Sequence, residues 1–265
     1  MLHTWRFTFR TNLVPLLLYS VGPRRAALHE IFACTTQKTL GNVYLVSDYN
    51  SSQTRLHTKV PIHESSCEIP TFSFRSSHYS APYTLYKLDM LRHLPSVIET
   101  VVLIDTDVIV SSNFVSDMTR HLTRTSKMAT MSISSAGGRF YGLQAGVIAF
   151  RLSSMRMLGE TWWNISGIPR DLQLAEQTLW DYFATSRPHW IGHLPCGFHL
   201  ETQVLQAALI DYNLSNSKRF PSAIHCPTTT TPPQILHGAG GMARTLEQLA
   251  WVLPSFGCNK LHSQQ

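Results

Sequence analysis

A short apolar run that ends in two aspartates is the strongest constraint on the fold of this chain. Val101 to Ile104 are four consecutive apolar residues, and Asp105, Thr106 and Asp107 follow directly. An apolar run of this length predicts a buried strand of a largely parallel sheet. Because side chains alternate along a strand, Asp105 and Asp107 point the same way if the extended geometry continues. The sequence therefore predicts an acidic pair at the edge of the sheet where open α/β folds bind ligands.

The acidic pair itself predicts a cation site. Two carboxylates on one side repel each other unless a cation lies between them, and their hard oxygens suit Mg²⁺ or Mn²⁺ bound to a diphosphate. A histidine ligand favours Mn²⁺. His237 follows an apolar strand and precedes a glycine-rich turn, so it is the best-placed histidine, with His225 second. The simpler alternative is one solvated aspartate and one helix cap.

Composition restricts the class of protein. With 265 residues and 43% hydrophobic content, the chain can bury the core of one or at most two domains. The net charge of +6 comes from scattered basic residues with no nucleic-acid motif beside them, so no nucleic-acid partner is expected. Five widely spaced cysteines without a CxxC pair argue against a zinc knuckle or a thioredoxin-type site.

Two sequence features bear on the cellular compartment, namely the apolar N-terminal stretch and the glycosylation sequons. The apolar stretch from Leu13 to Tyr19 contains Pro15 and is too short to span a membrane, and it lacks a signal-peptide cleavage pattern. We therefore expect no membrane segment in this chain. Three glycosylation sequons, at Asn50, Asn164 and Asn213, favour the lumen of the secretory pathway.

The periodicity of apolar residues gives a coarse order of elements. Helices are predicted over residues 13–28, 81–94, 153–163 (with Ser153 or Ser154 as N-cap), 174–183 and 246–253, with a helix or loop over 113–127. Strands are predicted over residues 29–35, 43–46, 101–104, 128–133, 141–150 and 234–237, with a short extended piece at 193–196.

An ordered set of motifs resembles glycosyltransferase family 8, and is closest to the LARGE-type xylosyltransferase and glucoside xylosyltransferase domains. The motifs are His78 to Asp107, Leu143 to Val147, Ala175 to Gln177, Leu194 to Cys196 and Ile235 to Gly238. The likeness covers roughly residues 13–253. An Asp-x-Asp alone is weakly diagnostic, whereas the whole set in the same order is more specific.

This resemblance implies an α/β fold of the GT-A type, with a mixed, mostly parallel sheet flanked by helices. Residues 13–265 would form a single such domain, and residues 1–12 are unassigned. It further implies a retaining, Mn²⁺-dependent transferase that moves a xylose- or glucose-type sugar from a UDP-sugar donor to a glycan or glycoprotein acceptor. Relatives of this kind are expected in the Golgi or endoplasmic reticulum lumen.

The resemblance also implies the roles of individual residues. The metal ligands would be Asp105, Asp107 and His237, with His225 as the alternative histidine. The nucleotide sugar would contact Lys87, Asp105, Thr106, Gln144, Ala145, Gly146 and Gly240. The catalytic residues would be Gln177, beside the reacting carbon, and Glu176, on the donor sugar.

Departures from the family pattern keep other functions open. The family's first strand should precede the helix predicted over residues 13–28, so a truncated or replaced start is expected. Gln144, Glu176 and Thr178 stand where the family carries Asn, Asp and Asp. These differences support a catalytically inactive relative that binds a glycan or a partner. A phosphatase of the Asp-x-Asp type is a third reading, but it needs a later acidic pair that is not found after Asp107.

Overall fold

The computed structural model describes part of the chain, and all structural statements concern that part. The described residues are 15–20, 43–47, 62–66, 74–76, 84–105, 108–111, 113–136, 139–173, 175–194, 199–201 and 234–237. Four predicted site residues lie outside these ranges, namely Thr106, Asp107, His225 and Gly240. The strand predicted over residues 29–35 and the helix predicted over 246–253 lie outside them as well.

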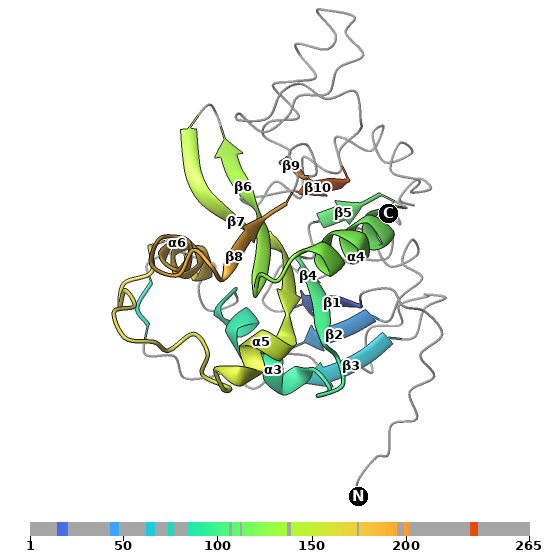
Figure 1. The fold of residues 1–265 in the computed structure, drawn as a ribbon, viewed down its shortest axis with the longest axis horizontal. Helices are drawn as coiled ribbons and strands as arrows, with labels where there is room; N and C mark the ends of the chain where they lie inside the picture. The colour runs from blue at the N-terminus through green and yellow to red at the C-terminus, as the bar shows by residue number, and fades with distance from the viewer. Residues whose placement is uncertain are drawn as a thin grey trace, which may run out of the picture.

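The larger sheet is mixed and mostly parallel (Figure 1). Its strand order is β3-β2-β1-β4-β7-β6-β8. The strands are β1 (Leu16–Ser20), β2 (Val43–Ser47), β3 (Ile62–Ser66), β4 (Thr100–Ile104), β6 (Ala129–Ala136), β7 (Arg139–Arg151) and β8 (Ile191–His193). Only β7 runs antiparallel to its neighbours β4 and β6, whereas the remaining adjacent strands are parallel. The predicted fold class is confirmed.

A second, smaller sheet continues from the end of β4. Its order is β5-β10-β9, formed by β5 (Val108–Val110), β10 (Ile235–His237) and β9 (His199–Glu201). Strand β10 runs antiparallel to β5 and parallel to β9. Because β4 ends at Ile104 and β5 begins at Val108, the acidic segment connects the two sheets.

Helices cover both faces of the larger sheet. They are η2 (Leu85–Asp89, a 3-10 helix), α3 (Met90–His93), α4 (Phe114–Arg124), α5 (Leu152–Met157) and α6 (Glu176–Ser186). The buried residues of η2, α3, α5 and α6 share one hydrophobic cluster, and those of α4 belong to the other. Among the described residues, no helix combines the length and the apolar character needed to cross a bilayer.

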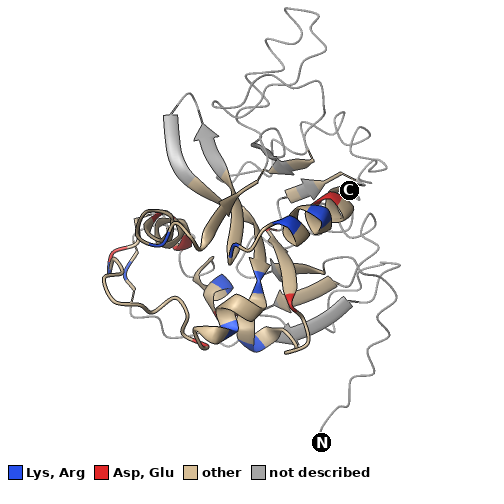
Figure 2. Ribbon diagram, in the orientation of Figure 1, with Lys and Arg blue, Asp and Glu red and all other residues tan. Residues whose placement is uncertain are grey.

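Basic side chains are spread over separate elements. Figure 2 shows Lys and Arg on α4, near α3 and in the loops, rather than gathered on one surface. This distribution agrees with the scattered basic residues of the sequence.

Strand β4 lies at the centre of the core and serves both of its halves. Val101 and Leu103 belong to the cluster below α6, and Val102 and Ile104 belong to the cluster below α4. All four side chains have no exposed surface. The apolar run therefore forms the two-sided buried strand that its composition predicts.

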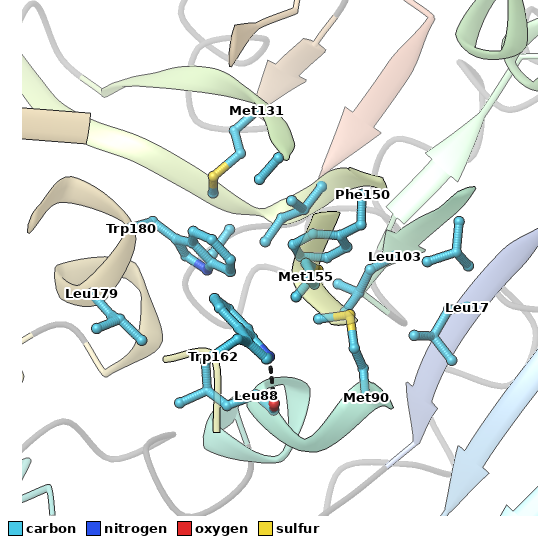
Figure 3. Close-up of a cluster of buried hydrophobic side chains, with 14 of the residues drawn as sticks. Leu17, Leu88, Met90, Leu103, Met131, Phe150, Met155, Trp162, Leu179 and Trp180 are labelled. Atoms are coloured by element: carbon cyan, nitrogen blue, oxygen red, sulfur yellow. Dashed lines mark hydrogen bonds between the residues drawn. The ribbon is translucent and has the colours of Figure 1, made fainter. Parts of the chain in front are cut away.

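Large aromatic side chains fill the cluster on the α6 side (Figure 3). The rings of Trp162 and Trp180 stack with their centroids 5.3 Å apart, and Phe150 lies 5.5 Å from Trp180. The indole of Trp162 donates a hydrogen bond of 3.2 Å to the carbonyl of Leu88, which satisfies its polar group inside the core. These contacts hold α6 and η2 on the same side of the sheet.

The helix predicted over residues 13–28 is wrong for residues 16–20, which form β1. This strand lies between β2 and β4, and Leu17 pairs with both Tyr44 and Leu103. Leu16, Leu17 and Leu18 are all buried because both faces of a central parallel strand are covered. Such a strand has no polar alternation, so periodicity cannot distinguish it from a buried helix. The expectation that the fold lacks its first strand is therefore wrong too.

Two other helices begin differently from their predictions. Residues 85–89 form a 3-10 turn that leads into the α-helical turn at 90–93. Helix α5 begins at Leu152 and ends at Met157, and no side chain caps it, so Ser153 and Ser154 lie inside it. It begins earlier because the N–H of Leu152 donates to the carbonyl of Glu99 at 2.7 Å, directly where β7 ends.

We predict that Leu17→Ala destabilises the protein by about 3 kcal/mol, since it removes a buried side chain of the central strand and leaves a cavity. Val97→Ala is the control, because that side chain is 57% exposed. It should change the free energy of unfolding by less than about 0.5 kcal/mol. Urea denaturation measures both, and equal effects would argue against a buried β1.

Candidate functional site

A buried lysine brings the predicted site residues together. The side chain of Lys87 is only 5% exposed. Its Nζ lies 2.7 Å from Oδ1 of Asp105 and 2.8 Å from Oε1 of Glu176, and it donates a longer hydrogen bond of 3.4 Å to the carbonyl of Ala145. Elements far apart in the sequence, η2, β4, β7 and α6, thus meet at one ammonium group.

Local structure explains how each charged group reaches this point. Leu85, Tyr86 and Leu88 on η2 are buried, so the short turn is fixed against the core and Lys87 enters with it. Asp105 directly follows the last residue of β4, and Glu176 is the first residue of α6. Two of the three groups therefore sit at the end of a regular element, where the chain leaves the core.

Among the described residues, Lys87 lies between two carboxylates and is held in its charged form. Burial by itself lowers the pKa of Lys87, but the charges of Asp105 and Glu176 and their hydrogen bonds outweigh it, and the pKa is raised above its ordinary value. Lys87 is therefore a permanent cation at physiological pH. One ammonium faces two carboxylates, and the Asp105 side chain, 27% exposed, is the one that reaches solvent.

His237 packs directly against the backbone of Gly146. A Cβ atom added to Gly146 would lie 2.1 Å from Cε1 and 2.6 Å from Nε2 of the His237 ring. The imidazole thus occupies the space that any other side chain at position 146 would need. The N–H of Asp105 donates to the carbonyl of Gly146 at 2.8 Å, so the same glycine also contacts the acidic segment.

The register of the small sheet places His237 beside the predicted metal segment. His237 pairs with Val108, the residue that follows Asp107 in the sequence. Its side chain is only 4% exposed. The structure therefore brings His237 next to both ends of the loop that carries the Asp-x-Asp motif.

An irregularity in strand β7 shapes the site. Ile148 pairs with Met131 of β6, but the next pair joins Gln144 to Ser132, so residues 145–147 have no partner in β6. Such irregularities bend a strand and redirect its groups, and they are frequent next to active sites. Here the carbonyl of residue 145 is directed to the buried lysine.

The side chain of Gln144 stabilises this irregular segment. Its Oε1 accepts a hydrogen bond of 3.0 Å from the N–H of Gly146, and both groups are buried. The hydrogen bond satisfies a backbone donor that would otherwise belong to the strand ladder. Gln144 is therefore a structural part of the site in addition to its predicted role at the nucleotide sugar.

Asp181 is a positioning residue that sequence reasoning missed. Its Oδ1 accepts a hydrogen bond of 2.7 Å from the N–H of Leu143, which ties α6 to β7. Burial raises the pKa of Asp181, and the Leu143 hydrogen bond opposes that shift. The sequence feature that could have identified Asp181 is its position as an acidic residue between Trp180 and Tyr182, in the middle of an aromatic helix.

Gln234 is a second missed positioning residue, and it fixes the strand that carries His237. Its Nε2 donates to Oδ2 of Asp117 on α4 at 2.8 Å, and its Oε1 accepts from Oγ of Ser111 at 2.6 Å. The N–H of Ser111 donates to the Gln234 carbonyl at 2.8 Å. No local sequence pattern identifies this contact, since it joins residues more than a hundred positions apart.

The structure places most of the predicted site residues together at the end of β4. These are Lys87, Asp105, Gln144, Ala145, Gly146, Glu176 and His237. Gln177 is half-buried on α6 beside Glu176. Within the described ranges, no group of three or more His, Cys, Asp or Glu side chains is arranged to hold a metal ion. Asp107, the third predicted ligand, lies outside them.

Comparison with known proteins gives the fold its name. No protein-family model matches the sequence, and no curated protein matches it. Among solved structures, apo mouse xyloside xylosyltransferase 1 is similar with a TM-score of 0.57 and 13% identity, covering 86% of this chain and 98% of that one. The galactosyltransferase LgtC, solved with donor and acceptor sugar analogues, is similar with a TM-score of 0.54 and 13% identity, covering 93% and 97%. The chain has the GT-A fold.

A third similar structure is the glycosyltransferase GlyE of Streptococcus pneumoniae TIGR4, with a TM-score of 0.57 and 12% identity. The match covers 86% of this chain and 55% of GlyE. Identities this low establish a shared GT-A fold and nothing finer. The predicted fold is confirmed, whereas the closer LARGE-type relationship stays a prediction.

Two of the expected metal ligands, Asp105 and His237, lie among the described residues. The carboxylate of Asp105 is partly exposed and shares the Lys87 ammonium with Glu176. The imidazole of His237 is seated in the gap at Gly146, next to the backbone of Asp105. A carboxylate, which follows β4, and an imidazole, which ends β10, are ligand types that Mn²⁺ accepts.

The residue before Glu176 has an unusual backbone conformation. Ala175 has φ 53° and ψ −133°, and its side chain is buried. This conformation favours glycine and costs an L-residue about 1–3 kcal/mol. The strained residue lies where the chain enters α6, directly before Glu176. The contacts around it, including the ion pair of Glu176 with Lys87, hold this conformation in place.

We predict that Gly146→Ala destabilises the protein by about 1–3 kcal/mol, because the new methyl group overlaps the His237 ring. Gly192→Ala is the strand comparison and should cost less, since its nearest atoms, Cγ of Lys127 at 3.0 Å and Oγ1 of Thr130 at 3.1 Å, lie farther away than the His237 ring. Adding His237→Ala to Gly146→Ala should recover part of the loss in urea denaturation. No recovery would argue against the contact.

We predict that Ala175→Gly stabilises the protein by about 1 kcal/mol, because the relief of strain exceeds the entropy that glycine adds to the unfolded chain. Ala184→Gly, inside the regular part of the same helix, should instead cost about 1 kcal/mol. Thermal unfolding of the two variants gives the comparison. A loss at both positions would contradict the strained conformation.

Proposed function

We propose that this chain is a retaining glycosyltransferase. It would transfer a xylose- or glucose-type sugar from a UDP-sugar to a glycan or glycoprotein acceptor, with Mn²⁺ as cofactor. The observation that carries the proposal is the ion cluster of Lys87, Asp105 and Glu176 at the end of β4, with His237 packed against the neighbouring Gly146, in a GT-A fold. The similar structures, a xylosyltransferase and a galactosyltransferase, support the same class of activity.

The metal would be held by Asp105, Asp107 and His237, with His225 as the alternative to His237. When bound, it would supply a Lewis acid that stabilises the charge developing on the leaving diphosphate. The chain's own part is to fix these ligands. Gly146 positions the His237 ring, and Gln234 holds its strand to α4.

Lys87 would bind and stabilise the donor as a fixed positive charge. Because its pKa is raised by the two carboxylates, it stays protonated and does not act as a proton shuttle. A preorganised cation in a buried site stabilises a developing anion without reorganisation. Ala145 and Gly146 would contact the donor, with Thr106, Gln144 and Gly240 as further donor contacts.

Glu176 and Gln177 would act at the sugar. Glu176 is held at 2.8 Å by Lys87, so its carboxylate is oriented and its charge is compensated. This arrangement suits a group that contacts the donor sugar. Gln177 follows it on α6 and would present its side-chain amide oxygen beside the reacting carbon, where it would steady an oxocarbenium-like sugar.

The alternative is a catalytically inactive GT-A protein that binds a glycan or a partner. One of its two motivations no longer holds, because the first strand is present as β1. The substitutions at Gln144 and Glu176 remain, yet Glu176 still reaches Lys87. The retained ion-pair geometry favours the transferase.

The proposed function also includes a cellular compartment. The proposed compartment is the lumen of the Golgi or endoplasmic reticulum, where the three sequons would be glycosylated. No nucleic-acid partner is part of the proposal.

We predict that UDP with Mn²⁺ at about a hundred times its Kd raises Tm by about 5–10 °C, since binding stabilises the folded state by about 2.7 kcal/mol. EDTA should abolish the shift. So should Asp107→Ala, whereas Asp171→Asn, an exposed aspartate, should keep it. Differential scanning fluorimetry gives the measurement, and a full shift without Mn²⁺ would contradict the metal bridge.

Turnover is tested by incubating the protein with UDP-xylose, UDP-glucose or UDP-galactose and Mn²⁺. Release of UDP, or transfer of labelled sugar to a glycan acceptor, is the expected result. Binding of UDP and Mn²⁺ with neither hydrolysis nor transfer from any donor would favour the inactive relative.

A further inference from the structure

Lys87 is shared between two carboxylates that belong to different parts of the proposed site. Asp105 is a proposed metal ligand, and Glu176 is proposed to contact the donor sugar. The ammonium lies at almost equal distances from both, 2.7 Å and 2.8 Å. Neither ion pair is on the surface, because the side chains of Lys87 and Glu176 are each 5% exposed.

Because Lys87 is paired with Asp105, it competes with any other cation for the Asp105 carboxylate. A divalent ion on this carboxylate would lie close to the ammonium, and two like charges at short range repel strongly in a buried site. Lys87 must then shift its interaction away from Asp105.

Glu176 provides the place to which Lys87 can shift. A buried ammonium that loses all its partners is strongly destabilising. With Glu176 at 2.8 Å, Lys87 keeps one full ion pair when its interaction with Asp105 weakens. Glu176 therefore lowers the cost of binding a cation at Asp105 without contacting that cation.

We propose that Lys87 is an internal counter-ion that a divalent metal partly displaces from Asp105, and that Glu176 sets the metal affinity by holding Lys87 on the other side. The inference rests on the metal site of the proposed function. It assigns Lys87 and Glu176 a positioning role in metal binding, separate from their contacts with the donor.

A double-mutant cycle on Mn²⁺ binding tests the coupling. Free Mn²⁺ is measured by electron paramagnetic resonance during titration of wild type, Lys87→Met, Glu176→Gln and the double variant, without nucleotide or sugar. Lys87→Met should tighten the Kd by on the order of tenfold, and Glu176→Gln should weaken it by a similar factor. In the Lys87→Met background, Glu176→Gln should have a several-fold smaller effect.

The Lys87→Arg variant distinguishes competition for the Asp105 carboxylate from a simple effect of positive charge on Mn²⁺ binding. It keeps the positive charge, but its planar fork can hold both carboxylates more firmly, so Mn²⁺ binding should weaken. The controls are Glu160→Gln, whose side chain is 71% exposed, and Lys127→Met, whose ammonium contacts the carbonyl of Pro188. Both should leave the Kd unchanged. Far-UV circular dichroism confirms folding of every variant.

The outcomes are distinct. Non-additive effects of Lys87→Met and Glu176→Gln support the inference, as does weaker binding by Lys87→Arg. Additive effects with an unchanged Kd in Lys87→Arg overturn it while the metal site itself stands. If Lys87→Met does not fold, Lys87→Arg and Glu176→Gln carry the test, and a wild-type Kd in both overturns it. Failure of the wild type to bind Mn²⁺ overturns the inference together with the metal part of the proposed function.

Discussion

The buried Lys87 is the constraint on which the rest of the site depends. An ammonium in the core is stable only with partners, and its partners come from the end of β4 and the start of α6. Removing one carboxylate leaves the ammonium with a single carboxylate partner, and removing both leaves a buried charge that the core cannot accommodate. The aromatic packing of Trp162 and Trp180 therefore has a second consequence, because it keeps α6 and η2 at the separation that this ion cluster requires.

Strands β4 and β1 show how far a sequence determines a fold. In both, a continuous apolar run is buried on two faces, and yet only β4 could be predicted as a strand. The run at 101–104 ends in polar residues that mark a sheet edge, whereas Leu16 to Leu18 has no such flank. The identity of β1 comes from its neighbours, since it fills the space between β2 and β4. That information is tertiary, and no local propensity contains it.

Within the site, the charged residues could be predicted and the contacts between them could not. Asp105 and His237 were identified from their positions after apolar strands. The His237 ring fits only because Gly146 has no side chain. This contact depends on the register shift between β7 and β6. The hydrogen bonds of Gln234 and Asp181 likewise join elements that meet only in the folded chain. Residue types point to a chemistry, and strand pairing decides whether the groups meet.

The substitution of glutamate for aspartate at position 176 illustrates how a departure from a family pattern should be judged. A motif comparison counts Glu176 as a difference, but a site depends on where the charge lies. Oε1 of Glu176 lies 2.8 Å from Nζ of Lys87, so this carboxylate forms a buried ion pair. The strained backbone of Ala175 is consistent with a helix start that is adjusted to place this carboxylate. The position of the carboxylate beside Lys87, rather than the residue type alone, decides whether Glu176 can serve the proposed chemistry.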